Sequence, residues 1–209
     1  SCPKLKTLKK IILSAGKLFL ILVVDDCSTD GTFEFLKEKK ISYIKNDKQI
    51  GYEKSIIKAF KYTINKKKKI ENIITMDADG EHLPSELKKF LKFKNFNLVI
   101  GKRSSYNRVI EYLISFIFRK KFKLHDPLSG FKMYSTKILK NKKNFNTNYL
   151  LVDLAAFIIA KNKKKCTNIS VKVKKRDGVS KLSNIFQLYL KMINIILFIL
   201  FFTKHENDS

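Results

Sequence analysis

The sequence predicts an α/β fold with a mostly parallel sheet flanked by helices, and three observations support this prediction. Short apolar runs of strand length alternate with segments whose apolar residues recur at helical spacing. Two of these runs end in aspartates, which suits the carboxyl edge of a parallel sheet, where ligands bind. A length of 209 residues, with 44% hydrophobic residues and no linker rich in proline, glycine or serine, indicates one domain with a sizeable core.

The expected strands are short. The run LFLILVV is apolar throughout and predicts a buried strand that ends at Asp25, whereas NISVKVKK alternates apolar and polar residues and predicts a half-exposed strand. Strands that alternate with helices imply parallel pairing through right-handed crossovers. The predicted strands are residues 18–24, 41–46, 70–76, 96–101 and 168–175.

Helices are expected between these strands. Asp30 or Thr29 is a suitable N-cap for the first of them, and Pro84 suits the first turn of the third. The predicted helices are residues 31–40, 52–65, 84–93, 107–121 and 150–161.

The stretch at residues 185–202 is nearly all apolar, with one charge at Lys191. A full membrane span needs roughly 20 apolar residues, so this stretch is of borderline length. We expect a helix that lies in the membrane interface or contacts a membrane protein, with a true span or a packed core helix as the alternatives. The predicted organisation is a main domain at 1–184, followed by this apolar helix and a polar tail at 185–209.

The formal net charge of +26 at pH 7 first suggests a polyanion as partner. However, only four of the 44 basic residues are arginine, no nucleic-acid-binding motif is present, and the aromatic residues are not interleaved with the basic runs. Solvated lysine-rich faces explain most of this charge, and attraction to an anionic membrane surface comes next. Nucleic acid is not an expected partner.

The three cysteines, Cys2, Cys27 and Cys166, lie far apart and form no CxxC pair. This spacing argues against a disulfide framework and against a zinc site, and it is typical of a reducing compartment. Together with the charge and the apolar C-terminal stretch, it predicts a peripheral or monotopic protein at the cytoplasmic face of a membrane.

Two of the expected strands end in acidic pairs, in VVDDCSTDG at 23–31 and in MDADG at 76–80. Asp25, Asp26, Asp77 and Asp79 should therefore converge at one edge of the sheet. Converging carboxylates repel one another unless a cation lies between them. A divalent Mg²⁺ or Mn²⁺ ion that also holds a diphosphate satisfies this requirement.

Five segments in order resemble the motifs of glycosyltransferase family 2, which has the GT-A fold. The set looks most like the polyprenyl-phosphate branch of that family, which includes dolichol-phosphate mannose synthase, and it covers roughly residues 18–184. The segments are VVDDCSTDGT (23–32), ITMDADGEH (74–82), VIGKRS (99–104), HDPLSGFKMY (125–134) and KKRDGVSKLS (174–183).

On the donor side, the resemblance implies that Asp25 and Asp26 contact the base and ribose of a nucleotide sugar. It implies that Asp77, Asp79 and Glu81 bind the metal, with Asp77 also at the diphosphate. The residues expected to close over the donor phosphates are Arg176, Ser180 and Lys181.

On the acceptor side, the resemblance implies that Arg103 and Arg108 receive the phosphate of a lipid acceptor and that Asp126 and Ser129 line the pocket. Arginine in this lysine-rich chain is informative, because its guanidinium forms bidentate phosphate contacts. Arg103 and Asp126 are the expected catalytic residues, with Asp126 as the base if the acceptor is a hydroxyl.

The implied activity is inverting transfer of a sugar from a nucleotide-sugar donor to a polyprenyl phosphate at the membrane, with a metal ion stabilising the leaving group. Transfer to a glycan hydroxyl in surface polysaccharide synthesis is the first alternative. Family members normally begin with a strand that lies inside the sheet and helps to form the nucleotide pocket, and residues 1–17 read instead as the helix that follows it. A catalytically inactive domain is therefore the second alternative.

Overall fold

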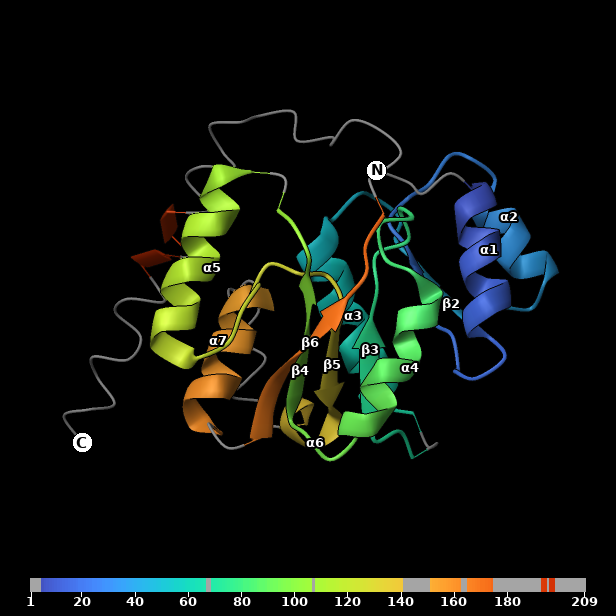
Figure 1. Cartoon of the computed structure of the whole chain (residues 1–209). Helices are drawn as coiled ribbons and strands as arrows, with labels where there is room; N and C mark the ends of the chain where they lie inside the picture. The colour runs from blue at the N-terminus through green and yellow to red at the C-terminus, as the bar shows by residue number, and fades with distance from the viewer. Residues whose placement is uncertain are drawn as a thin grey trace.

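The computed structural model shows an α/β domain with helices on both faces of its larger sheet (Figure 1). The structure describes residues 5–66, 69–106, 108–140, 151–162, 165–174, 193–194 and 196–197.

Within these ranges the strands are three to six residues long, and β2, β3, β4 and β6 lie close to their predicted positions. They are β1 (Val23–Asp25), β2 (Tyr43–Lys45), β3 (Asn72–Thr75), β4 (Leu98–Arg103), β5 (Lys132–Ser135) and β6 (Cys166–Val171).

Strand pairing divides them into two sheets. β1 and β2 form a parallel pair, and the second sheet has the order β3-β5-β4-β6. β4 and β6 are parallel, as predicted, but β5 lies antiparallel between β3 and β4. The sequence did not predict β5, whose four residues are all buried, because its lysine and serine break the apolar pattern of a strand buried on both faces.

The helices follow the predicted alternation. They are α1 (Leu5–Ala15), α2 (Thr32–Glu38), α3 (Tyr52–Ile64), α4 (Leu87–Phe90) between the 3₁₀ turns η1 (Pro84–Glu86) and η2 (Leu91–Phe93), α5 (Val109–Phe122), α6 (Thr136–Leu139) and α7 (Leu151–Lys161).

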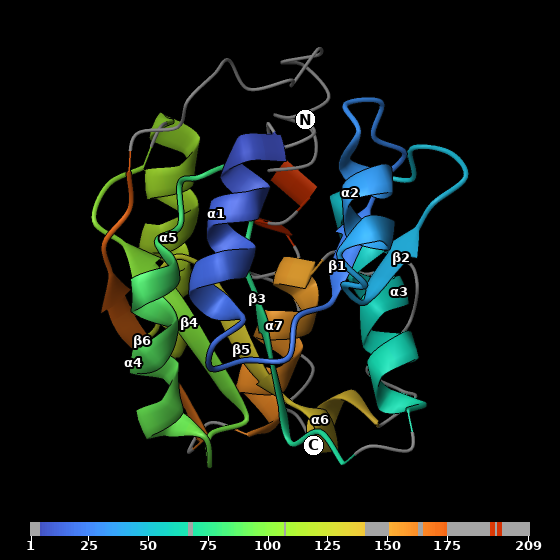
Figure 2. The same ribbon diagram turned by 90° about the vertical axis from the view of Figure 1, so that its right-hand side faces the viewer.

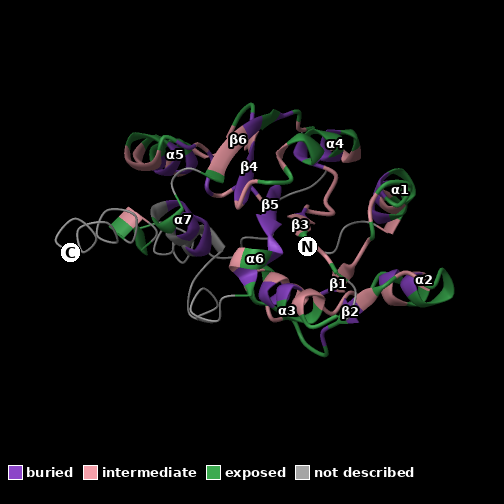
Figure 3. Ribbon diagram, turned by 90° about the horizontal axis from the view of Figure 1, so that it is seen from below, coloured by how far each residue is buried: buried purple, intermediate pink, exposed green. Residues whose placement is uncertain are grey.

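Alternate residues of β4 pack into two separate hydrophobic clusters. Leu98 and Ile100 pack with α3, α5, α6 and α7 on one face, whereas Val99 packs with α1 and α4 on the other. Successive side chains of a strand point to opposite faces, so a run of three apolar residues supplies both cores. Figures 2 and 3 show the helices arranged accordingly on the two sides of the sheet.

The first strand is shorter than the predicted 18–24. Leu18 and Leu20 are 58% and 73% exposed, and Leu18 and Phe19 instead donate backbone hydrogen bonds to Ala15 in a turn that ends α1. Phe19 and Ile21 pack against the cluster beside α1 and α4. Apolar content alone therefore did not distinguish a strand from a turn that lies against the core.

A break separates the two sheets between β1 and β3. Figures 2 and 3 place β1 between β3 and β2, yet no ladder joins β1 to β3 in the described part of the chain. This break lies where a strand inside the sheet would complete the pairing.

Helix α2 begins one residue later than expected. Gly31 holds the N-cap position with a φ of 78°, and Asp30 Oδ1 accepts hydrogen bonds from the backbone and the hydroxyl of Thr32. Asp30, which precedes the N-cap residue Gly31, thus stabilises the first turn of α2.

Most of the predicted apolar helix at 185–202 lies outside the described residues. Across the ranges that are described, no helix has the length and hydropathy required to cross a bilayer. Of this stretch, Ile196 packs against the core cluster to which α5 and α7 contribute.

We expect Phe118→Ala to destabilise the protein by about 3–5 kcal/mol, because this side chain is fully buried between α5 and the sheet. Phe116→Ala, two residues away on the exposed face of α5, should change the free energy of unfolding by no more than about 0.5 kcal/mol. Urea denaturation of both variants measures the difference, and equal losses would contradict the packing of α5.

Candidate functional site

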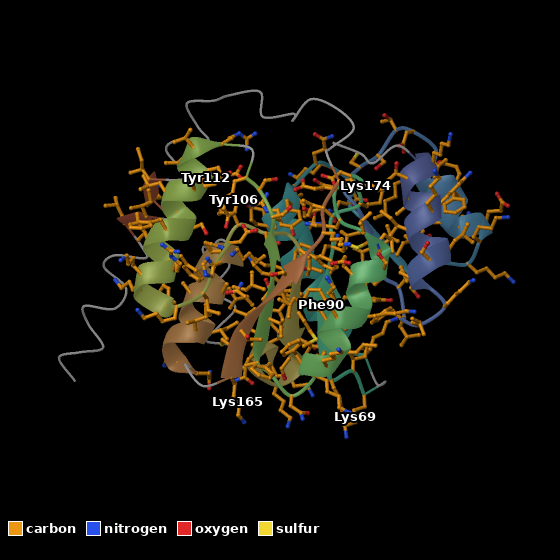
Figure 4. The ribbon with its side chains drawn as sticks, in the orientation of Figure 1. Lys69, Phe90, Tyr106, Tyr112, Lys165 and Lys174 are labelled. Atoms are coloured by element: carbon orange, nitrogen blue, oxygen red, sulfur yellow. The ribbon has the colours of Figure 1, made fainter. Side chains whose placement is uncertain are left out.

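The carboxyl ends of β3, β4 and β6 lie at one edge of the larger sheet. The residues after β6 run beside the loop after β3, since His82 forms a β-bridge with Val173 and the Lys174 N–H donates to the Glu81 carbonyl at 2.9 Å. Figure 4 shows Lys174 at the same edge as Tyr106, with Lys165 at the opposite edge. Of the predicted site residues, Asp77, Asp79, Glu81 and Arg103 lie at or directly after the strand ends of this edge.

The two acidic loops meet at the first turn of α1. Gly31 in the first loop lies against Leu5, and Gly80 in the second, with a φ of 86°, lies against Thr7. Tyr52 also lies between the loops, because its hydroxyl, whose pKa burial raises, is close enough to the Asp77 carboxylate for that charge to raise the pKa further, and its neighbour Gly51 donates to Asp26. The ends of β1 and β3 therefore face the same side of the molecule.

Asp26 holds the loop between β2 and α3. Its carboxylate accepts hydrogen bonds from the Asn46 amide and the Ile50 N–H, both at 2.9 Å, and from the Gly51 N–H at 3.0 Å. Burial by itself would raise the pKa of Asp26, but these donors together hold it below the usual value. Asp26 therefore positions this loop, and its contact with a nucleotide stays a prediction.

Asp25 ends β1 with its carboxylate almost fully buried. Oδ1 accepts from the Ser28 N–H at 3.0 Å, and no hydrogen bond from the described residues reaches Oδ2. An acceptor buried in this way favours a ligand with a donor group, such as an N–H of a nucleobase.

Asp77 lies where the loop after β3 meets the loop before β5. A side chain at Gly130 would collide with the Asp77 carboxylate, so only glycine allows this approach. His82 Nδ1 accepts the Asp77 N–H at 3.3 Å, and the ring packs on Phe131. Burial lowers the pKa of His82 despite the opposing charge of Glu81, so the ring is neutral and Nδ1 remains an acceptor.

Asp79 and Glu81 have different partners. Asp79 Oδ1 accepts the Glu81 N–H at 3.0 Å, whereas Glu81 Oε1 lies 3.7 Å from Arg103 Nη1. Within the described ranges, no three acidic, histidine or cysteine side chains are placed to hold a metal together. Glu81 is therefore an ion-pair partner of Arg103, and its role as a metal ligand stays a prediction.

Arg103 lies at the end of β4 within a group of carboxylates. Its Nε and backbone N–H donate to Asp126 Oδ2 at 2.9 and 3.0 Å, and Nη2 donates to Asp126 Oδ1 at 2.9 Å and to Glu111 Oε2 at 3.4 Å. Burial opposes a high pKa for Arg103, but Asp126 and Glu111 raise it, so the side chain stays charged. Asp126 and Glu111 thus accept from Nε and Nη2, whereas Nη1 has the longer ion pair with Glu81 at 3.7 Å. Binding of the acceptor phosphate by Arg103 stays a prediction.

Asp126 and Ser129 are also tied into the protein. Both Asp126 oxygens accept from Arg103 and only 1% of the residue is exposed, so it has no free oxygen for a substrate hydroxyl. Ser129 is equally buried, and its hydroxyl accepts the Phe131 N–H at 3.2 Å. The roles of Asp126 as a base and of Ser129 as an acceptor contact stay predictions.

Arg108 is the more accessible of the two predicted acceptor-side arginines. Its side chain is 31% exposed, against 10% for Arg103, and Nη1 donates to Glu111 Oε1 at 3.1 Å. It occupies the N-cap position of α5, directly beside the Arg103 cluster. Arg108 therefore remains the side chain that is placed to meet a phosphate at this edge.

Lys132 is a second buried cation beneath the site. Nζ donates to the Pro127 carbonyl at 2.6 Å, which holds the loop that carries Asp126. Burial lowers the pKa of Lys132 to about 8, although the charges of Asp126 and Asp77 oppose this shift. Its position between these carboxylates reduces their mutual repulsion.

The sequence did not single out Tyr52, Glu111 or Lys132 as site residues. Glu111 had a local signal, since it follows Arg108 at the i,i+3 spacing of a helical ion pair. Tyr52 and Lys132 had none, because their partners lie 25 residues away at Asp77 or on a strand that was not predicted. The predicted donor-phosphate residues Arg176, Ser180 and Lys181 lie outside the described residues.

Comparison with known proteins identifies the family of the chain. The model of the family described as "Glycosyl transferase family 2" matches residues 5–147. The chain belongs to glycosyltransferase family 2.

Two uncharacterized proteins of Methanocaldococcus jannaschii are similar to this glycosyltransferase. MJ0544 is 30% identical over 195 residues, which cover 82% of this chain and 84% of that protein, and MJ1222 is 35% identical over 86 residues, which cover 40% and 35%.

Solved structures support the GT-A fold of this glycosyltransferase. Glucosyl-3-phosphoglycerate synthase of Mycobacterium tuberculosis, crystallised with Mn²⁺, UDP-glucose and phosphoglyceric acid, superposes with a TM-score of 0.71 at 13% identity, over 95% of this chain and 76% of that one. Its complex with UDP gives a TM-score of 0.70 at 14% identity, over 95% and 77%. At this identity the similarity establishes the fold alone.

We expect Asp126→Ala to lower the free energy of unfolding by about 3–5 kcal/mol, because it leaves the buried Arg103 without its main partner. Asp47→Ala removes an exposed carboxylate and should cost less than about 0.5 kcal/mol. Chemical denaturation compares the two variants. A stable Asp126→Ala protein that loses only activity would instead indicate a catalytic base.

We expect Asp26→Asn to cost about 1–3 kcal/mol at neutral pH, because an amide cannot accept hydrogen bonds at both of its terminal atoms. The lowered pKa of Asp26 means that its contribution is complete above pH 3.8 and is lost as the pH falls through the folded-state pKa. The difference from wild type should therefore shrink in strong acid. Chemical denaturation at several pH values measures this difference, with the exposed Asp47→Asn as control. If the difference in the free energy of unfolding does not change with pH, the stabilising role of the Asp26 carboxylate is contradicted.

Proposed function

We propose that this glycosyltransferase moves a sugar from a nucleotide-sugar donor to a polyprenyl-phosphate acceptor at a membrane surface. The observation that carries the proposal is the arrangement of charge along one edge of the sheet. The acidic ends of β1 and β3 lie together on one flank, and Arg108 stands partly exposed on the other, beside the Arg103 cluster.

The acidic flank suits the donor. Asp25 Oδ2, a buried acceptor, is available to a donor group of the base, and Asp77 and Asp79 lie on the loop beside it. Mg²⁺ and Mn²⁺ bind through one or two carboxylates plus substrate phosphates, so Asp77 and Asp79 suffice without a third protein ligand. Such an ion, when bound, would supply charge stabilisation for the departing nucleoside diphosphate. The Mn²⁺ and UDP-glucose in the Mycobacterium tuberculosis synthase support this part of the proposal.

The basic flank favours an acceptor that carries phosphate. Transfer to a glycan hydroxyl requires a group that takes the proton, and Asp126, the predicted base, has both oxygens bound by Arg103. A phosphate oxygen is already anionic near neutral pH and requires no such base. A lipid phosphate fits the membrane attraction that the net charge of +26 predicts.

The test is incubation of the full chain with radiolabelled UDP- or GDP-sugars, Mn²⁺ and undecaprenyl phosphate, with label measured in the chloroform phase. We expect extractable label. Arg108→Gln should raise KM for the lipid phosphate about tenfold or more without changing nucleotide affinity, because it removes a charged hydrogen bond. Asp79→Ala should abolish the Mn²⁺-dependent binding of UDP or GDP measured by calorimetry.

Lys140→Gln, which removes an exposed charge after α6, is the control and should behave as wild type. Label in an aqueous glycan would replace the lipid acceptor with a hydroxyl acceptor. No label together with no nucleotide binding would indicate an inactive domain.

A further inference from the structure

One face of α5 leaves four large apolar side chains in solvent. The residues follow the i, i+3, i+4, i+7 spacing of a single helix face, while Ile114 and Phe118 on the opposite face are fully buried. We call this face the α5 stripe, and its members are Val109 (85% exposed), Tyr112 (53%), Leu113 (46%) and Phe116 (49%).

Cations continue this face in the last turn of α5. Arg119 and Lys120 follow Phe116 at i+3 and i+4, and both lie over its ring at 5.6 Å from the centroid. Lys121 and Lys123 come next in the chain. Apolar side chains beside long cationic ones are typical of helices that lie in a lipid interface, where the cations reach the headgroups.

The stripe begins at the functional site. Arg108 occupies the N-cap position of α5, directly before Val109. Tyr112 packs edge-on against Tyr106 at 4.7 Å, and Tyr106 shares a hydrogen bond with Ser115, whose hydroxyl accepts the Asp126 N–H. Figure 4 shows Tyr106 and Tyr112 together at this end of the helix. A surface that covered the stripe would therefore lie next to Arg108.

We propose that the α5 stripe docks on an anionic lipid surface and so brings Arg108 to the level of the headgroups. The proposal rests on the proposed function, because it assigns a surface for the approach to a lipid-linked phosphate. The basic residues at the end of the stripe and the net charge of +26 select anionic lipid as the occupant, since a typical protein-binding surface is poor in lysine at its centre. The helix lies flat on the bilayer, which agrees with the finding that no described helix is long and apolar enough to span one.

Vesicle flotation of the full chain tests the proposal without any need for enzyme activity. The probe is vesicles of phosphatidylcholine with phosphatidylglycerol. The double variant Leu113→Ser/Phe116→Ser should lower the partition coefficient by about tenfold or more, because it removes two large apolar side chains from the interface. Leu13→Ser/Leu20→Ser is the matched control, since it removes two exposed apolar side chains from the region of α1 and should leave binding unchanged.

A second variant tests the charge. Arg119→Gln/Lys120→Gln should lower binding to the anionic vesicles by about fivefold per charge and should leave the weak binding to pure phosphatidylcholine unchanged. Circular dichroism and thermal melts establish that every variant folds, as their exposed positions lead us to expect.

Two results would overturn the proposal. If the wild type binds neither kind of vesicle, the stripe does not dock on lipid and is instead a contact surface for a protein partner. If the Leu113→Ser/Phe116→Ser variant binds as well as the wild type, another segment, such as 185–202, carries the attachment.

Failure of the proposed function gives a different pattern. In that case the stripe variants lose vesicle binding while the wild type transfers no sugar to undecaprenyl phosphate. If both proposals hold, Leu113→Ser/Phe116→Ser loses transfer to vesicle-embedded acceptor and keeps transfer to a short-chain polyprenyl phosphate in solution.

Discussion

The guanidinium of Arg103 is held by carboxylates from three different segments, and the arrangement of the whole site depends on this contact. Asp126 comes from the loop before β5, Glu111 from the first turn of α5 and Glu81 from the loop after β3. Arg103 itself ends β4. A buried ion pair of this kind adds little net stability compared with apolar packing, but removal of one partner is costly. Its effect is therefore mainly geometric, since it places three segments around the end of one central strand.

The balance of charge follows from the same cluster. The cations Arg103, Arg108 and Lys132 face the carboxylates of Glu81, Glu111 and Asp126, so these six groups largely compensate one another. Asp25, Asp77 and Asp79 lie on the other flank, where a divalent ion and a diphosphate would complete the charge balance. The site thus separates into a compensated flank, with Arg108 at its exposed margin, and an acidic flank. This separation is the physical basis for assigning acceptor and donor to opposite sides.

Two features connect the site to the rest of the molecule. Helix α5 carries Glu111 and Ser115 on its buried face and the apolar stripe on its exposed face, so one helix links the arginine cluster to the protein surface. On the acidic flank no strand of the described ranges pairs β1 with β3. There the two acidic loops lie against α1 and beside Tyr52.

The sequence by itself determined the α/β class, the order of most elements and the two acidic strand ends, because hydrophobic periodicity and short motifs are local properties of the chain. The predicted strands at 41–46, 70–76 and 96–101 agree closely with β2, β3 and β4, and the predicted helices agree closely with α2, α3, α4, α5 and α7, whereas α6 was not predicted. Local pattern failed at 18–22, where apolar residues form a turn, and at β5, where Lys132 interrupts the strand signal. Only the tertiary structure decided that Arg103 and Asp126 bind each other, that Glu81 belongs with them, and that Arg108 is the accessible arginine. The physical reason is that the partner of a buried charge depends on the register of distant strands and on desolvation. The spacing of residues within a motif predicts neither of these.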